Sequence, residues 1–175
     1  MLLTSSKHKT GTDRIREVAD IIKSDIIVNI QGDEPFINPV NIDNTILPLL
    51  SDNKLNVSTL AVRIENKKDI DDPNKVKVVF DNFYNAMYFS RSRIPFELDR
   101  KKSIYYKHIG LYVFRKNYLY AFSEMKQTKL EKTEKLEQLR ILENGERIRV
   151  VLTKKDSLSI DTMKDFKDLL KLMKI

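Results

Sequence analysis

The sequence predicts a single mixed α/β domain over residues 1–175, with a mostly parallel sheet and flanking helices. A chain of 175 residues, 41% hydrophobic and 33% charged, has the size and composition of one globular domain. Strand-like and helix-like segments alternate along it, without internal repeats or a linker. The first helix-like segment lies between two strand-like segments, and that arrangement implies a parallel pair.

The first half of the chain shows this alternation. Residues 1–4 look like the end of a strand, and apolar residues within 15–22 then recur at helical spacing. The β-branched, nearly continuous IIVNI at 26–30 is typical of a strand covered on both faces. A helix is predicted over 39–50, where proline takes the first helical position, and 56–64 reads as the next strand.

The second half begins with a hairpin and then alternates again. Its predicted elements are, in order, a hairpin over 75–90, a strand over 107–116, a helix over 118–125, a helix over about 130–144, a strand over 147–153 and a final helix from 162. The helix over 130–144 has a candidate capping box in Thr128 and Glu131, and Gly145 is a natural stop.

Composition argues against several classes of protein. No apolar run approaches the roughly 20 residues that cross a bilayer, so no membrane span is expected. The first residues lack the basic and apolar regions of a signal peptide. Without cysteine the fold uses neither disulfides nor thiolate metal ligands, which suits the reducing cytoplasm. The two histidines lack HExxH spacing, so a zinc site is not expected.

The net charge of +7 raises the question of nucleic-acid binding. The 32 basic residues are scattered among 25 acidic ones and match no helix-turn-helix, zinc-finger or RNP-type signature. We therefore expect a solvated basic surface that attracts phosphorylated small molecules, and no nucleic-acid partner.

Glycine is scarce in this chain. The four glycines, Gly11, Gly32, Gly110 and Gly145, form neither a GxGxxG pattern nor a P-loop. A phosphate-binding loop of either kind is therefore absent or is supplied by another chain.

Carboxylates follow two predicted strand ends. Asp33 and Glu34 come directly after the strand at 26–30, and Asp161 stands at a second strand-to-helix junction. Ligands of open α/β sheets bind outside the carboxyl ends of strands, and two such Asp residues could jointly hold one Mg²⁺ with substrate phosphates. The alternatives are a solvated turn at Asp33 and helix capping at Asp161, although Thr162 already meets that need.

Other polar side chains could form a site or be purely structural. His108 and Tyr112 share one face of a predicted strand, or are ordinary polar residues at a sheet edge. Glu137 and Gln138 lie on one face of a predicted helix, which could equally be a solvated face with ion pairs. Arg91 could hold an anionic group bidentately or be a plain surface arginine.

Seven blocks of residues occur in the order and approximate spacing of one protein family. They are HxTGTDR (8–14), IVNIQGDEP (27–35), PNKVKVV (73–79), YFSRSRIP (88–95), KHIGLY (107–112), LEQLR (136–140) and SIDT (159–162). On these blocks the sequence resembles the 3-deoxy-manno-octulosonate (Kdo) cytidylyltransferases, the CMP-Kdo synthetases of lipopolysaccharide biosynthesis. The resemblance covers essentially the whole chain. CMP-sialic acid synthetases share the fold but are less similar in the QGDEP and LEQLR blocks.

The resemblance implies a Rossmann-like nucleotidyltransferase fold and a CTP-dependent reaction. In that reaction the anomeric hydroxyl of Kdo attacks the α-phosphate of CTP, and pyrophosphate leaves. Mg²⁺ is the implied cofactor, with Asp33 and Asp161 as its ligands and as the catalytic residues. The implied sugar-binding residues are Gln31, Arg91, His108, Tyr112, Glu137 and Gln138, and the implied nucleotide-binding residues are Thr10, Gly11, Thr12 and Arg14.

The N-terminus departs from the family pattern. Members begin with a strand, a phosphate loop with Arg and Lys, a helix and a second strand before the block at 8–14, and Thr10 stands where they usually have Ser. A βαβ unit takes roughly 30 residues, so we expect a truncated chain with little or no turnover by itself. The alternatives are a non-catalytic remnant or split-enzyme subunit that docks to a complementing N-terminal chain, and a CMP-sialic-acid-type enzyme. Because family members are commonly dimers, a homodimer is also expected.

Overall fold

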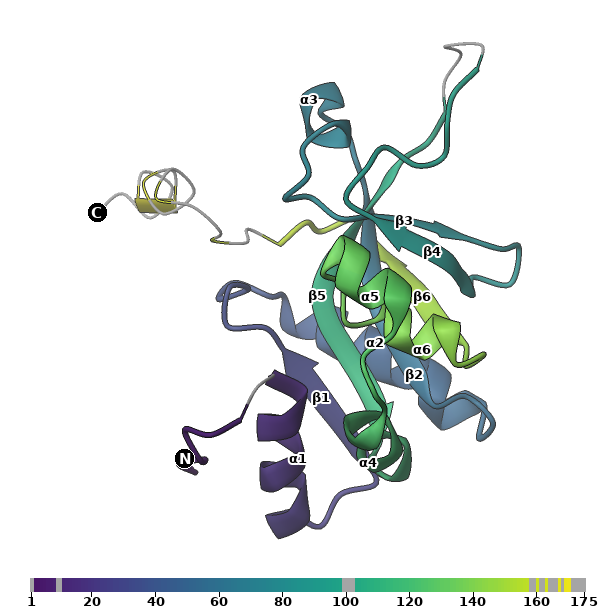
Figure 1. Cartoon of the computed structure of the whole chain (residues 1–175). Coiled ribbons are helices and arrows are strands. Elements are labelled where there is room, and N and C mark those ends of the chain that lie inside the picture. Colours follow the sequence, from purple (N-terminus) through teal and green to yellow (C-terminus); the bar gives the residue numbers. More distant parts are fainter. Residues whose placement is uncertain are drawn as a thin grey trace.

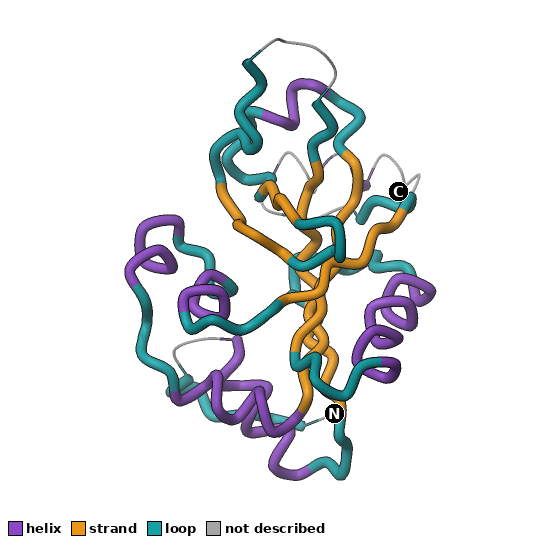
Figure 2. The backbone as a smooth tube through the Cα atoms, turned by 90° about the vertical axis from the view of Figure 1, so that its right-hand side faces the viewer, coloured by secondary structure: helices purple, strands orange, loops and turns teal. Residues whose placement is uncertain are grey.

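The computed structural model describes residues 2–8, 11–98 and 103–157, and positions 160, 163, 167, 169 and 170. Within them, one six-stranded sheet has helices on both faces (Figure 1). The view turned by 90° shows the strands running between helices on either side (Figure 2). Such layering follows from the apolar strands, because a sheet with two apolar faces must be covered on each.

The elements alternate as the sequence predicts. The helices are α1 (Gly11–Ile21), α2 (Pro39–Ser51), α3 (Lys67–Ile70), α4 (Lys116–Glu124), α5 (Lys129–Glu134) and α6 (Leu139–Glu143). The strands are β1 (Ile26–Ile30), β2 (Val57–Arg63), β3 (Lys77–Phe80), β4 (Ala86–Ser90), β5 (Tyr106–Arg115) and β6 (Ile148–Thr153). Most predicted boundaries are confirmed to within about two residues, and the predicted final helix lies largely outside the described residues.

The prediction of a mostly parallel sheet is wrong. The strand order is β4-β3-β5-β2-β6, with β1 also paired to β5, and only β2 and β6 run parallel among the described strands. β5 runs antiparallel to β1, β2 and β3. Residues 2–5 form no strand, so the crossover predicted from them to β1 is not observed.

β5 is the strand around which the sheet is organised. On one side it pairs with β2 along most of its length. On the other side it pairs with β3 at Lys107 and with β1 from Leu111 onward. Between these pairings, the His108 N–H donates to the Val76 carbonyl at 2.8 Å, and the Gly110 carbonyl accepts the Gln31 N–H at 3.1 Å. β1 and β3 therefore diverge beside residues 108–110.

Two apolar cores cover the two faces of the sheet. α2 packs on one face, where Leu49 is buried with Leu55 and Val113. On the other face, α1, α4, α5 and α6 cover a larger cluster that includes Phe114 and Phe122 (Figures 1 and 2). The divergence of β1 and β3 opens toward this second face.

The helix predicted over 130–144 is broken into two short helices. α5 begins as predicted, because the Glu131 carboxylate accepts the Thr128 backbone N–H at 3.1 Å. α5 ends at Lys135, which takes a left-handed conformation with φ of 54°. Glu137 and Gln138 consequently lie in the link between α5 and α6, not on the face of a continuous helix. This break is what brings them to the sheet.

No helix within the described part of the chain is long and apolar enough to cross a membrane.

Candidate functional site

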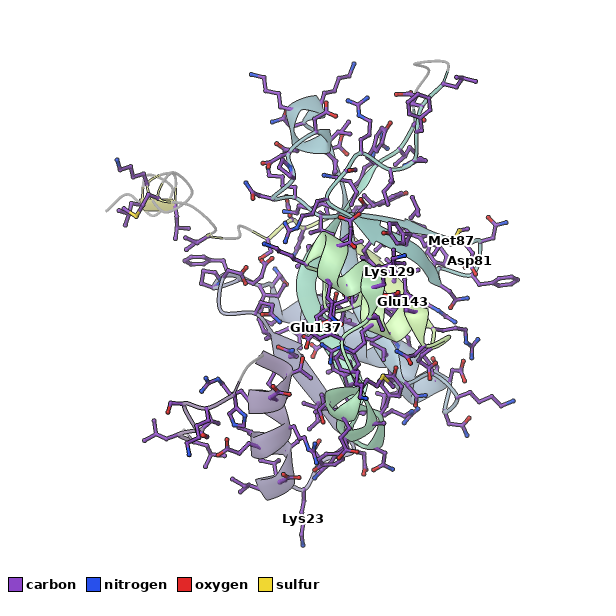
Figure 3. The ribbon with its side chains drawn as sticks, in the orientation of Figure 1. Lys23, Asp81, Met87, Lys129, Glu137 and Glu143 are labelled. Atoms are coloured by element: carbon purple, nitrogen blue, oxygen red, sulfur yellow. The ribbon has the colours of Figure 1, made fainter. Side chains whose placement is uncertain are left out.

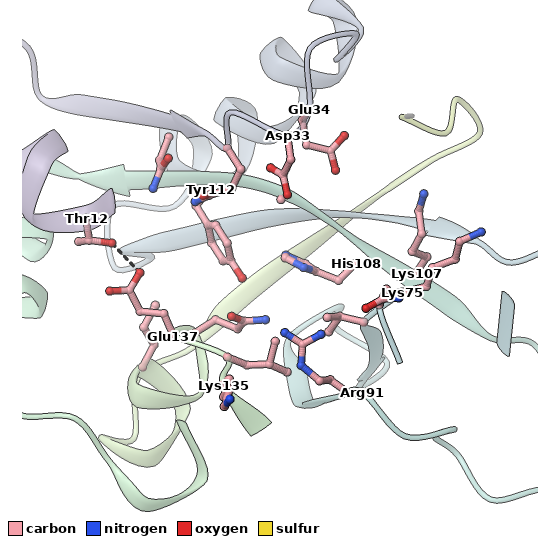
Figure 4. A pocket seen from close by; sticks show the side chains of 18 of the residues that line it. Thr12, Asp33, Glu34, Lys75, Arg91, Lys107, His108, Tyr112, Lys135 and Glu137 are labelled. Atoms are coloured by element: carbon pink, nitrogen blue, oxygen red, sulfur yellow. Dashed lines mark hydrogen bonds between the residues drawn. The ribbon is translucent and has the colours of Figure 1, made fainter. Parts of the chain in front are cut away.

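A cavity of about 500 Å³ lies where β1 and β3 diverge from β5. Its size is within the range of small-molecule sites. Figure 4 shows the side chains of His108 and Tyr112 between Asp33 and Glu34 on one side and Glu137 and Arg91 on the other. Three parts of the fold thus line it, which are the strands, the α5–α6 link and the loops around β3 and β4.

The strand side of the cavity depends on a glycine. A Cβ atom on Gly110 would lie 3.0 Å from Cγ of Gln31 and 3.3 Å from its Cβ. Such contacts are too close for ordinary packing, so only glycine leaves Gln31 its present position. The KHIGLY block therefore contributes in two ways. It carries the polar residues His108 and Tyr112, and its glycine leaves the space that the Gln31 side chain occupies.

His108 and Tyr112 extend from the same face of β5 into the cavity. The His108 ring packs edge-on against Phe89 and beside Tyr112, each with centroids 5.2 Å apart. Burial, helped by the Lys107 charge, lowers the pKa of His108 to about 3, so the ring is neutral at neutral pH. The Tyr112 hydroxyl is buried without a hydrogen-bond partner among the described residues. Burial, reinforced by the Glu137 charge and only partly opposed by the nearby Thr59 hydroxyl, raises its pKa well above the usual value, so it remains a phenol.

The helix side presents a carboxylate at the α5–α6 link. Glu137 accepts a hydrogen bond from the Thr12 hydroxyl at 2.7 Å, which ties the link to α1 (Figure 4). Burial raises the Glu137 pKa, although the Thr12 hydrogen bond and the Arg140 charge oppose that shift. Figure 3 shows Glu137 toward the middle of the molecule, whereas Lys23 extends away from its lower end.

Arg140 holds this link through a buried ion pair. Its guanidinium donates to both carboxylate oxygens of Glu131, at 2.5 and 2.8 Å, and both side chains are about 5% exposed. It also lies over the Phe122 ring at 4.9 Å and reaches Glu137 at 3.5 Å. The position of Glu137 therefore depends on a charge pair that the solvent hardly reaches.

Four cations line the remaining side of the cavity. They are Lys75, Arg91, Lys107 and Lys135. Arg91 donates from Nε to the Glu134 carbonyl at 2.9 Å and from Nη1 to the Pro73 carbonyl at 3.0 Å. Lys75 is paired with Asp69 and Lys107 with Asp156, so Arg91 and Lys135 contribute most to the attraction of this rim for a carboxylate or phosphate.

A buried lysine fixes the Arg91 loop. Lys77 is fully buried, and its ammonium donates to the carbonyls of Asp72 at 2.8 Å and Arg91 at 2.6 Å. Burial lowers the Lys77 pKa, and the nearby carboxylates oppose that shift. Lys77 thus joins the segment before β3 to the segment after β4.

Asp33 and Glu34 follow β1 and border the cavity. The Asp33 carbonyl accepts the Ile160 backbone N–H at 2.9 Å, so the chain returns to β1 at residue 160. Asp161 lies outside the described residues, and the described ones hold no group of three or more metal-ligating side chains. Carboxylate oxygen is the donor that Mg²⁺ prefers, and Mg²⁺ takes only one or two carboxylates beside substrate phosphates. Asp33 therefore fits that cofactor.

The predicted site residues are mostly brought together. The cavity is lined by Thr12, Gln31, Asp33, Arg91, His108, Tyr112, Glu137 and Gln138. Gly11 and Arg14 do not line it, and Arg14 instead donates to the Thr4 hydroxyl at 2.5 Å. Thr10, like Asp161, lies outside the described residues. Thr59, whose hydroxyl lies 2.8 Å from Nε2 of His108, was not predicted as a site residue.

Comparison with known proteins identifies relatives along the chain. A cytidylyltransferase family model matches residues 1–148. The 3-deoxy-manno-octulosonate cytidylyltransferase of Solibacter usitatus is 49% identical over 173 residues, which are 98% of this chain and 69% of that protein. That of Pelobacter propionicus is 51% identical, over 93% of this chain and 68% of the relative.

Solved structures with a similar fold include a protein of the same kind. A CMP:2-keto-3-deoxy-manno-octonic acid synthetase complexed with CTP superposes with a TM-score of 0.92 at 34% identity, over 99% of this chain and 71% of the other. A glucose-1-phosphate thymidylyltransferase from Bacillus anthracis, described as putative, reaches a TM-score of 0.60 at 16% identity, a likeness of fold alone.

Proposed function

The chain belongs to the 3-deoxy-manno-octulosonate cytidylyltransferase family, and from that membership we propose that its cavity serves CMP transfer from CTP to Kdo. The observation that carries the proposal is the convergence of six residues from distant parts of the chain on one cavity. They are Gln31, Arg91, His108, Tyr112, Glu137 and Gln138. Their hydroxyl, amide, imidazole and carboxylate groups suit a polyhydroxylated sugar acid.

The cavity offers different partners to the two kinds of group on Kdo. Glu137 and Gln138 present acceptors for sugar hydroxyls, and the Tyr112 hydroxyl has no partner among the described residues. The cations at the rim, among them Arg91 and Lys135, suit the Kdo carboxylate. We propose that the sugar lies across β5 with its carboxylate toward this rim.

We propose that Asp33 and Asp161 hold Mg²⁺ beside the nucleotide. The support is the carboxylate of Asp33 at the border of the cavity and the return of the chain to it at Ile160. When bound, Mg²⁺ would neutralise triphosphate charge and lower the pKa of the attacking hydroxyl. Asp33 itself would orient the metal, and the cavity would orient the sugar hydroxyl.

Binding of Kdo, measured by isothermal titration calorimetry, tests the sugar site. Glu137→Gln should weaken binding by about tenfold, because one charge-assisted hydrogen bond is worth roughly 1.5 kcal/mol. Glu65→Gln, a change at an exposed side chain outside the cavity, should leave the affinity unchanged. No binding of Kdo, or equal affinities of the two variants, would count against the site.

Release of pyrophosphate from CTP, with Kdo and Mg²⁺ present, tests the transfer. Any release should stop with Asp33→Asn, because the metal loses a carboxylate. Asp43→Asn on the exposed side of α2 is the matched control and should change nothing. Release that survives Asp33→Asn would overturn the metal assignment.

A second candidate function is docking to a partner chain. The observation that favours it is the edge of β1, which pairs only with β5 among the described strands. An unpaired edge can accept a strand from another chain. Light scattering should then detect a complex with the part of the Solibacter relative that this chain does not match. A chain that stays alone in that mixture would exclude this function.

A further inference from the structure

Thr59 lies on β2 opposite an irregularity in β5. The pairing register joins Thr59 to Tyr112 and Leu60 to Ile109, so Gly110 and Leu111 have no partners on β2. A bulge of this kind interrupts the ladder of hydrogen bonds between the strands. Main-chain N–H and C=O groups at the bulge then need other hydrogen-bond partners. Thr59 is fully buried at this point, with 0% of its surface exposed.

The Thr59 hydroxyl makes two hydrogen bonds of equal length. Its oxygen lies 2.8 Å from the Leu111 carbonyl and 2.8 Å from Nε2 of His108. A hydroxyl has one proton to donate, and a carbonyl can only accept. The proton therefore goes to Leu111, and Thr59 offers a lone pair to His108. Nε2 must then carry the hydrogen.

We infer that Thr59 is a positioning residue for His108: its hydroxyl fixes the Nε2–H tautomer and leaves Nδ1 as a bare acceptor facing the cavity. His108 lines the cavity (Figure 4), and Nδ1 has no hydrogen-bond partner among the described residues. The rings of Phe89 and Tyr112 pack against the imidazole and hold its plane.

The tautomer decides what kind of group His108 can bind. A bare Nδ1 accepts a hydrogen bond from a hydroxyl and repels a carboxylate or carbonyl oxygen. Because the ring is neutral near pH 7, Nδ1 carries no proton from a doubly protonated ring and remains an acceptor. If the proposed function is correct, on which this step rests, Nδ1 takes a hydroxyl of Kdo, while the sugar carboxylate must face the cationic rim.

Nitrogen NMR of the two histidines measures the tautomer directly. In the long-range proton–nitrogen spectrum of ¹⁵N-labelled chain at pH 7.5, His108 should show a protonated Nε2 and a bare Nδ1. His8→Gln assigns the signals, since His8 is the other histidine. A protonated Nδ1 in the unmodified chain would overturn the inference without the need for any variant.

Two substitutions at position 59 test the cause. Thr59→Val removes the hydroxyl and should give a mixture of tautomers or the Nδ1–H form, whereas Thr59→Ser should keep the original pattern. His8, which pairs with Glu17, should be unchanged in both. An unaltered His108 pattern in a folded Thr59→Val chain would contradict the role of Thr59.

Titration with Kdo separates this inference from the proposed function. Acceptance of a hydrogen bond from a Kdo hydroxyl should shift the Nδ1 resonance when the site is saturated with Kdo. Thr59→Val should weaken the binding of Kdo by about tenfold. The Nδ1 chemical shift could stay constant on addition of Kdo in a chain that shows the Nε2–H tautomer. That result would overturn the proposed sugar site and leave the tautomer assignment intact.

Discussion

The two sides of the cavity are held in place by different interactions. On the strand side, His108 and Tyr112 are neutral groups fixed by backbone pairing and ring packing, and Gly110 leaves the room that Gln31 occupies. On the helix side, Glu137 depends on the buried pair of Arg140 and Glu131. A position fixed by neutral packing responds to volume, whereas one fixed by a buried ion pair fails when either partner is lost. The two sides should therefore respond to different substitutions.

The largest effect is expected from Arg140→Met. Loss of the guanidinium leaves the Glu131 carboxylate buried and unpaired, which should lower the free energy of unfolding by about 3–5 kcal/mol in urea denaturation. The double variant Arg140→Met with Glu131→Gln should recover most of that loss, because the most deeply buried charge, that of Glu131, is then removed. A single variant that costs less than about 1 kcal/mol would show that the helix side does not depend on the pair.

Lys77→Met tests a case between neutral packing and a buried ion pair. Here a buried ammonium donates its hydrogen bonds to neutral carbonyls. The carbonyls of Asp72 and Arg91 lose their donor, and unfolding should become easier by roughly 2 kcal/mol. Lys75→Met is the matched control, because its ion pair with Asp69 is partly exposed and should be worth less than about 1 kcal/mol. Equal losses from the two variants would argue against a special role for the buried lysine.

Gly110→Ala tests the strand side by volume alone. The added methyl group meets the Gln31 side chain, so we expect about 1–2 kcal/mol of destabilisation and a displaced Gln31 in a crystal structure. Gly32→Ala places a methyl group where no atom lies within 4 Å and should stay within about 0.5 kcal/mol of the parent. An unmoved Gln31 in the Gly110 variant would contradict the packing argument.

The effect that is smallest at neutral pH, and that grows as the pH falls, is a pH dependence from His108. Its pKa is about 3 in the folded chain and near 6.5 when unfolded, so the unfolded chain binds more protons between these values. The free energy of unfolding should fall as pH drops through this window, by up to about 1.4 kcal/mol per pH unit. His108→Gln should remove that component, whereas Tyr112→Phe should not. Identical slopes for these two variants would show that His108 titrates normally.

Local pattern was sufficient to predict most elements but not their directions. The β-branched run at 26–30 and the proline at position 39 mark boundaries that the structure shares. The pairing of β5 with three antiparallel neighbours depends on contacts between residues far apart in sequence, which periodicity does not report. The break at Lys135 was missed for the same reason, since Arg140 reaches back to Glu131 across it.

The site residues were found by family blocks more than by spacing. Glu137 and Gln138 were assigned to a helix face, and only the resemblance gave them a role. Thr59 belongs to none of the blocks, yet it was open to inference: Ser58 and Thr59 are hydroxyl residues inside a strand that is buried at every position but its last. A buried hydroxyl needs a partner, and that requirement is the signal that would have found it.

The change of partner along β5 also bears on how the cavity could vary among related chains. The space arises because two strands leave a common neighbour at residues 108–110, so it belongs to the main chain. Substitution of side chains can alter what the space recognises, but a change in the path of a strand would be needed to remove it. The scaffold can therefore keep its recess while its chemical preference changes.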